Sequence, residues 1–128
     1  MILPVLFVAP SDKGGRGVFA SEPIKKGTTV EISPVLVFSK KERACLEETK
    51  LYDYVFEWGE RSNKVCVALG YVSLYNHDYH SNCDYIMDYE DLMMSIVTVR
   101  DIKKGEELCI NYNAEPDDET PVWFMTKK

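Results

Sequence analysis

The segment Ser73–Tyr85, SLYNHDYHSNCDY, gathers both histidines of the chain with tyrosines, asparagines and a cysteine. The first chemistry to weigh is a metal site built from His77, His80 and Cys83. The spacing H-x-x-H-x-x-C is not a common zinc arrangement and offers at most three ligands, so no metal is predicted. The amide of Asn76 both donates and accepts hydrogen bonds, which suits an amino-acid-like ligand. A turn with a hydrogen-bonded histidine is the alternative.

Two further segments could also do chemistry. DKGGRGVFA (12–20) places glycines just before a β-rich run, where missing Cβ atoms let backbone groups approach a ligand. The phosphate-loop pattern G-x-x-x-x-G-K-[ST] is absent, and a glycine-rich hairpin turn is the alternative. KKGEELCINYNA (103–114) reads alone as a strand ending in Tyr112, with Glu106 and Glu107 as solvated turn charges.

Taken together in this order, the three segments resemble the SET-domain lysine methyltransferases. GGRGVFASEPIKKGTTV is similar to that family's N-terminal G-x-G cofactor segment. YNHDYHSN is similar to its N-H-S-x-x-P-N motif, with Asn76, His77 and Asn82 in register. GEELCINY resembles its G-E-E-L-x-x-x-Y signature, closed by Tyr112. The resemblance covers nearly the whole chain, and its specificity lies in the ordered triple and its spacings.

This resemblance implies methyl transfer from S-adenosylmethionine to the ε-amine of a protein lysine. The cofactor would lie against the asparagine-histidine pair and the backbone of the glycine segment, with a tail tryptophan over its adenine. In this interpretation the histidine acts by backbone contact and packing, not as a metal ligand. The implied cofactor-binding residues are Gly15, Arg16, Gly17, Asn76, His77 and Trp123.

The resemblance also implies a lysine channel walled by tyrosines. Tyr112 would be the catalytic tyrosine at the methyl-transfer site. Tyr85 falls where the family chooses between phenylalanine and tyrosine, and tyrosine there usually limits the product to monomethyl-lysine. Tyr54 matches a third, substrate-binding channel position. Core packing is the alternative explanation for each of the three.

The chain also departs from the family pattern. Asp78 replaces the family's serine and Ser81 its proline, so that turn is expected to differ in detail. No cysteine follows Cys109, so the zinc-bound post-SET module of many relatives is missing, and a pre-SET module is absent too. The chain therefore resembles a minimal catalytic core of the kind seen in bacteria and large viruses.

These residues need a scaffold, and the pattern predicts a mostly β one. Ser39 and Glu42 form a capping-box pattern that opens a helix reaching to about Lys50. YDYVFEW then alternates with period 2, and with KVCVAL it predicts a hairpin over Leu51–Leu69. Further strands are predicted in MILPVLFVAP, CDYIMD, MMSIVTV and ELCINY, and a short helical turn in YVSLYNH.

Two segments of the chain have similar sequences, Ala20–Ile32 and Thr98–Ile110. Each contains I-K-K-G between β-rich runs, so Gly27 and Gly105 are expected at turns of two strand–turn–strand units. We predict a single domain over residues 1–128. Its predicted fold is mostly β, a SET-type fold of several small twisted sheets (β-clip-like) with one or two short helices.

The bulk composition narrows the partners and the compartment. The net charge of −6 argues against nucleic-acid binding and fits a basic peptide substrate. No segment approaches the roughly 20 apolar residues of a membrane span, so no membrane association is predicted. The four cysteines are scattered without a C-x-x-C pair, which favours reduced core thiols in a cytoplasmic protein. A homodimer is left open, because a minimal domain could need a neighbour to complete its peptide groove.

Two other interpretations compete with the enzyme. A non-enzymatic β-clip domain of the SAF type would explain the repeated I-K-K-G but not Asn76-His77 joined to Tyr112. A degenerate SET domain would bind a peptide or ligand without transferring a methyl group, although the catalytic tyrosine is retained here.

Overall fold

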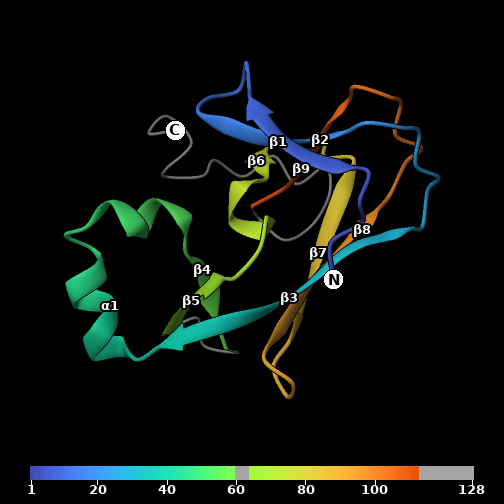
Figure 1. Cartoon of the computed structure of the whole chain (residues 1–128). Helices are drawn as coiled ribbons and strands as arrows, with labels where there is room; N and C mark the ends of the chain where they lie inside the picture. The colour runs from blue at the N-terminus through green and yellow to red at the C-terminus, as the bar shows by residue number, and fades with distance from the viewer. Residues whose placement is uncertain (60–63, 113–128) are drawn as a thin grey trace.

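Strands dominate the fold (Figure 1). A computed structural model of the chain describes residues 1–59 and 64–112. The strands are β1 (Leu6–Pro10), β2 (Arg16–Ala20), β3 (Thr29–Phe38), β4 (Phe56–Trp58), β5 (Lys64–Ala68), β6 (Asn76–His77), β7 (Cys83–Asp88), β8 (Met93–Thr98) and β9 (Glu107–Ile110). The helices are α1 (Lys40–Leu46) and the short 3-10 helices η1 (Lys50–Tyr54) and η2 (Val72–Leu74). The predicted mostly β fold with short helices is confirmed.

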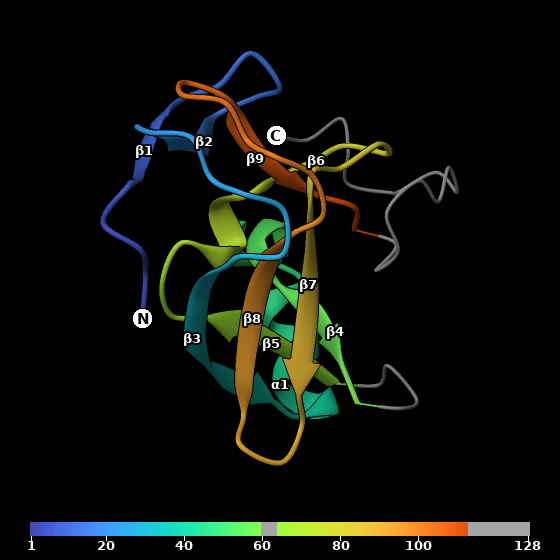
Figure 2. The ribbon, with the colours of Figure 1, turned by 90° about the vertical axis from the view of Figure 1, so that its right-hand side faces the viewer.

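The described strands form two sheets. One has the order β1-β2-β9-β6 and the other the order β4-β5-β3-β8-β7. Figure 2 shows β3, β8 and β7 side by side, with β1, β2 and β9 gathered beyond their end. In the first sheet, β9 lies between an antiparallel neighbour, β2, and a parallel one, β6, where Asn76 pairs with Cys109. This parallel pairing brings the asparagine-histidine pair beside the G-E-E-L segment.

The two I-K-K-G segments connect the sheets. The predicted strand–turn–strand units exist, but the two strands of each unit lie in different sheets: β2 leads to β3, and β8 leads to β9. The segments pair with each other instead, because Ile24 and Ile102 exchange backbone hydrogen bonds of 2.9 and 2.7 Å. Gly27 and Gly105 both have φ of +83°, which explains the glycine at each turn.

The helical region is shorter than predicted and changes character. The capping box forms, since Ser39 N–H donates to Glu42 and Glu42 N–H donates to Ser39 Oγ. However, α1 ends at Leu46 and residues 50–54 form η1, so the strand predicted over YDYVFEW is wrong for its first half. Local and tertiary contacts accompany this turn: the Tyr52 N–H donates to the Thr49 carbonyl at 3.2 Å, and the Tyr52 hydroxyl accepts a hydrogen bond from Arg43 of α1 at 3.2 Å. Only β4 and β5 form the hairpin strands.

The core lies between the two sheets and includes Val18, Val30, Tyr75, Met94, Ile96 and Leu108, all of them fully buried. The four cysteines are free thiols. Cys66, Cys83 and Cys109 are buried as predicted for core thiols, whereas Cys45 is exposed on α1. Among the described residues, no helix is both long enough and apolar enough to cross a membrane.

Candidate active site

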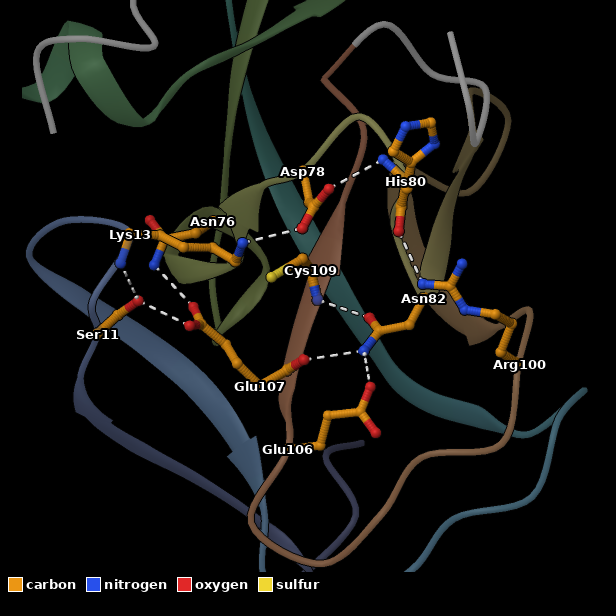
Figure 3. A network of polar contacts seen from close by, with 10 residues as sticks. All are labelled: Ser11, Lys13, Asn76, Asp78, His80, Asn82, Arg100, Glu106, Glu107 and Cys109. Atoms are coloured by element: carbon orange, nitrogen blue, oxygen red, sulfur yellow. Dashed lines mark hydrogen bonds and ion pairs between the residues drawn. The ribbon is translucent and has the colours of Figure 1, made fainter. Parts of the chain in front are cut away.

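Asn76 lies at the centre of a buried polar network (Figure 3). It opens β6, and its side-chain nitrogen Nδ2 donates to the Arg16 carbonyl at 3.0 Å and to Glu107 Oε2 at 2.9 Å. The other oxygen of Glu107, Oε1, accepts a hydrogen bond from the Ser11 hydroxyl at 2.7 Å. Asn76 therefore fastens the glycine segment to β9 through side-chain contacts.

The glycine segment is a hairpin turn between β1 and β2, and it also lines a pocket. Ser11 N–H donates to the Gly15 carbonyl at 2.9 Å, and Gly14 and Gly15 have positive φ values of 125° and 55°. Gly17 has a different reason to be glycine. A Cβ at this position would overlap Glu107 Oε2 and press on the Asn76 amide. Gly17 thus makes room for the bond between Asn76 and Glu107.

A pocket of about 170 Å³ opens beside this network. It unites three of the predicted cofactor residues, Gly15, Arg16 and Asn76, although they are up to 61 positions apart. Tyr54, predicted for the lysine channel, lies on the same wall. The full lining is Gly14, Gly15, Arg16, Lys50, Asp53, Tyr54, Leu74 and Asn76. Lys50, Asp53 and Leu74 were not predicted, because nothing in the sequence alone indicates that η1 and η2 reach the glycine turn.

His77 connects the pocket side of β6 to the tyrosines. Its Nδ1 accepts a hydrogen bond from the Tyr112 backbone N–H at 3.0 Å, and its ring contacts those of Tyr79 and Tyr112 at centroid distances of 4.4 and 5.1 Å. His77 therefore orients the tyrosine's backbone. Within residues 1–59 and 64–112, no group of three or more His, Cys, Asp or Glu is placed to hold a metal ion.

Tyr85, Tyr112 and Phe56 form an aromatic cluster next to His77. The Tyr112 hydroxyl donates to the buried Tyr75 carbonyl at 2.7 Å, and the Tyr85 hydroxyl approaches the Tyr112 carbonyl at 3.4 Å. Phe56 packs against both rings, at centroid distances of 5.4 Å to Tyr85 and 6.3 Å to Tyr112. Phe56 belongs to the alternating segment YDYVFEW, but the sequence did not predict it in the site.

Burial dominates the ionisation of these two tyrosines. It raises the pKa of Tyr112 far above its ordinary value, with smaller contributions from Cys109, Glu107, Tyr54 and Tyr85. It raises the pKa of Tyr85 in the same direction. Both hydroxyls therefore stay protonated across the physiological range.

Glu106 and Glu107 correct the prediction of solvated turn charges. Glu107 bonds to Ser11 and Asn76 as described above, and Glu106 accepts from Asn82 Nδ2 and from the Lys103 N–H, both at 2.9 Å. The contacts with Ser11, Asn76 and Asn82 join residues distant in sequence and leave no local pattern, so charge spacing could not have indicated them.

Asn82 joins the turn that follows β6 to the backbone of β9. Its Nδ2 also donates to the Glu107 carbonyl at 2.8 Å, while its Oδ1 accepts the Cys109 N–H at 2.8 Å.

The departures from the family motif have structural consequences. Asp78 accepts the His80 N–H at 2.9 Å, as a serine hydroxyl could, and in addition forms a 2.9 Å ion pair with Lys13 at the tip of the glycine turn. His80 is exposed. Trp123, predicted to cover the adenine, lies outside the described residues.

The family model of the SET domain matches residues 15–113. This chain belongs to the SET-domain family of protein-lysine methyltransferases. The matched range contains β2, β6 and β9, which carry Arg16, Asn76 and Glu107.

Two relatives support this assignment. The chain is 44% identical over 120 residues to a Schizosaccharomyces pombe histone-lysine N-methyltransferase specific for lysine-37 of histone H3; the match covers 93% of this chain and 76% of the relative. It also resembles a crystal structure of a candidate histone methyltransferase from Plasmodium falciparum, at 31% identity and a TM-score of 0.64, covering 87% of this chain and 95% of that one.

Proposed function

We propose that this SET domain transfers a methyl group from S-adenosylmethionine to the ε-amine of a protein lysine and releases mainly the monomethylated product. The observation that carries this proposal is the dipeptide Asn76-His77. Asn76 lines the pocket and holds the glycine turn, whereas His77 holds the backbone of Tyr112. A ligand site and a tyrosine cluster are thereby joined within two residues.

The pocket suits the amino-acid portion of S-adenosylmethionine. The backbone of the turn at Gly14 and Gly15 offers polar groups without side chains, and Asp53 and Asn76 line the same pocket. A carboxylate and an amide can accept hydrogen bonds from an ammonium group, and Lys50, which also lines the pocket, can pair with a carboxylate. When bound, this cofactor supplies a methyl group activated by its sulfonium.

The tyrosine cluster suits the lysine. A lysine with a pKa of about 10.4 needs roughly 4.6 kcal/mol to be neutral near pH 7, and only the neutral amine has a lone pair. Desolvation lowers the lysine pKa. The rings of Phe56, Tyr85 and Tyr112 offer a site of low polarity, and the two protonated hydroxyls can orient the neutral amine. Alignment of the amine with the methyl group then contributes the larger part of the rate.

Monomethylation is proposed from the position of Tyr85. Its hydroxyl points toward the Tyr112 carbonyl at 3.4 Å and so occupies space inside the cluster. A methylated amine would need that space in order to turn for a second transfer.

The substrate is proposed to be a basic histone-like segment. The Schizosaccharomyces pombe relative acts on lysine-37 of histone H3, and the acidic net charge of −6 fits a basic partner. The cytoplasmic location and the homodimer stay predictions.

The test is methyl transfer to core histones with isotope-labelled S-adenosylmethionine, followed by mass spectrometry of the products. We expect a single labelled methyl group on a lysine, and its loss in the Tyr112→Phe variant. Binding of the cofactor without any transfer would instead identify a degenerate, peptide-binding SET domain. Absence of cofactor binding would refute the proposed use of S-adenosylmethionine by this SET domain.

A further inference from the structure

The Asn76 amide has no choice of orientation. Its Nδ2 carries two N–H groups, and they point to the Arg16 carbonyl and to Glu107 Oε2. A backbone carbonyl only accepts hydrogen bonds, and so does an ionised carboxylate. Turning the amide over would place Oδ1 against two acceptors, so the nitrogen must face them.

The orientation of this amide determines which atom Asn76 offers to the pocket that it lines. Since both N–H groups are engaged elsewhere, the oxygen Oδ1 is the polar atom that this side chain can offer to a ligand. Asp53, which lines the same pocket, also presents an acceptor. The pocket thus offers two side-chain acceptors from separate parts of the chain, which matches a cationic donor group.

Glu107 is itself held on both oxygens. Its Oε1 accepts from the Ser11 hydroxyl at 2.7 Å, its Oε2 accepts from Asn76, and its backbone carbonyl accepts from Asn82 Nδ2 at 2.8 Å (Figure 3). Gly17 leaves the space that the carboxylate fills. The carboxylate is therefore fixed by one contact to β6 and one to the turn before β2, and the backbone of Glu107 by a third contact.

We infer that Glu107 is a positioning residue: it locks the Asn76 amide with Oδ1 toward the pocket, and so makes this subsite select a ligand that carries an ammonium group. The inference rests on the proposed cofactor, whose α-ammonium is that donor. Glu107 does not touch the ligand in this scheme. It acts only through Asn76, and it therefore affects one part of the cofactor and not the rest.

Glu107→Gln tests the inference with little change of shape. A glutamine can donate from Nε2 to Asn76 Oδ1, so only the Arg16 carbonyl still requires the original orientation. The Asn76 amide can then turn more easily and present N–H groups to the ammonium. The adenosine part of the ligand should not sense this change. Two ligands separate the effects: S-adenosylhomocysteine carries the amino-acid group, and 5′-methylthioadenosine has the same nucleoside thioether without it.

The measurement is calorimetric binding of both ligands to the full chain. We expect Glu107→Gln to weaken S-adenosylhomocysteine binding by about tenfold or more, the loss of one charge-assisted hydrogen bond, with 5′-methylthioadenosine changed by less than about twofold. Glu106→Gln is the matched control, since Glu106 bonds to Asn82 and Lys103 but not to Asn76. It should leave the ratio of the two affinities unchanged.

Equal weakening of both ligands by Glu107→Gln would overturn the inference, because the residue would then only support the fold. No change in either ligand would overturn it as well. If the wild-type chain binds neither ligand, the proposed cofactor is wrong and the inference falls with it. If the variant does not fold, the same binding measurement is made on the wild-type chain with S-adenosylhomocysteine and with its analogue lacking the α-amino group. S-adenosylhomocysteine must bind about tenfold or more tightly, and equal affinities would refute the selection for an ammonium group.

Discussion

Removing the Tyr112 hydroxyl should have two separate effects, one on the stability of the fold and one on the rate of methyl transfer. In the Tyr112→Phe variant the 2.7 Å bond to the Tyr75 carbonyl is lost, and that carbonyl belongs to a fully buried residue. A buried acceptor left without its donor costs about 1–3 kcal/mol of unfolding free energy. For a domain of this size we expect the melting temperature to fall by about 4–10 °C.

This destabilisation is too small to affect the rate at room temperature. A domain with about 5–15 kcal/mol of stability stays almost fully folded after losing about 2 kcal/mol. Any large loss of kcat must therefore come from the chemistry. If the hydroxyl orients the amine or the methyl group, we expect kcat to fall about 100-fold, which corresponds to about 2.7 kcal/mol of transition-state stabilisation.

The assay is single-turnover methyl transfer with saturating peptide and cofactor at about 25 °C, next to thermal unfolding of the same preparations. Tyr85→Phe is the matched control for the unfolding measurement only, because it removes a hydroxyl of the same cluster whose hydrogen bond is long, 3.4 Å, and therefore weak. A Tyr112→Phe variant that melts early but keeps kcat within about threefold would refute the catalytic role and leave Tyr112 a packing residue.

Four further predictions follow from the same geometry. Tyr85→Phe should shift the product from monomethyl- toward dimethyl-lysine in mass spectra, since the hydroxyl no longer fills the cluster; unchanged monomethylation would remove Tyr85 from the channel. Burial raises the pKa of Cys66 from 9.0 to about 12, so the unfolded chain loses this thiol proton first. In urea unfolding, the contribution of this thiol to the free energy of unfolding should be constant below about pH 9. Above that pH the free energy of unfolding should fall by up to about 1.4 kcal/mol per pH unit for each buried thiol. A disulfide reagent should label one thiol quickly in the native chain, Cys45, and all four in denaturant, whereas fast labelling of several would contradict the burial. The Lys13 and Asp78 pair, partly exposed on both sides, should show a coupling below about 1 kcal/mol in a Lys13→Met and Asp78→Ser cycle, and the coupling should disappear at high salt.

The sequence indicated those parts of the fold that depend on local pattern. Ser39 and Glu42 mark the start of α1 because a capping box is a contact between residues three positions apart. The alternation in CDYIMD and MMSIVT gives β7 and β8, since each strand has one buried face. Gly27 and Gly105 mark turns because their φ values are positive. Each of these signals needs only neighbouring residues.

The parts that the sequence did not indicate depend on distant contacts. The Ser11 hydroxyl donates a hydrogen bond to Glu107, which lies 96 positions away, and no charge pattern around Glu107 predicts that bond. Residues 52–54 continue the alternation of YDYVFEW, yet they form a 3-10 turn in which Tyr52 contacts Arg43 of α1. The same turn brings Asp53 to the pocket, so the wrong local prediction also left this lining residue unidentified.

The position of β9 between β2 and β6 makes the ligand site a late product of folding. The contacts of Asn76 span 60 positions to Arg16 and 31 to Glu107, so long loops must close before the two acceptors and the glycine turn meet. Partly folded chains should have no affinity for the cofactor. If S-adenosylmethionine binds as proposed, it should stabilise only the completed fold, by RT ln(1 + [L]/Kd), and destabilised variants should therefore unfold at higher temperature when the cofactor is present.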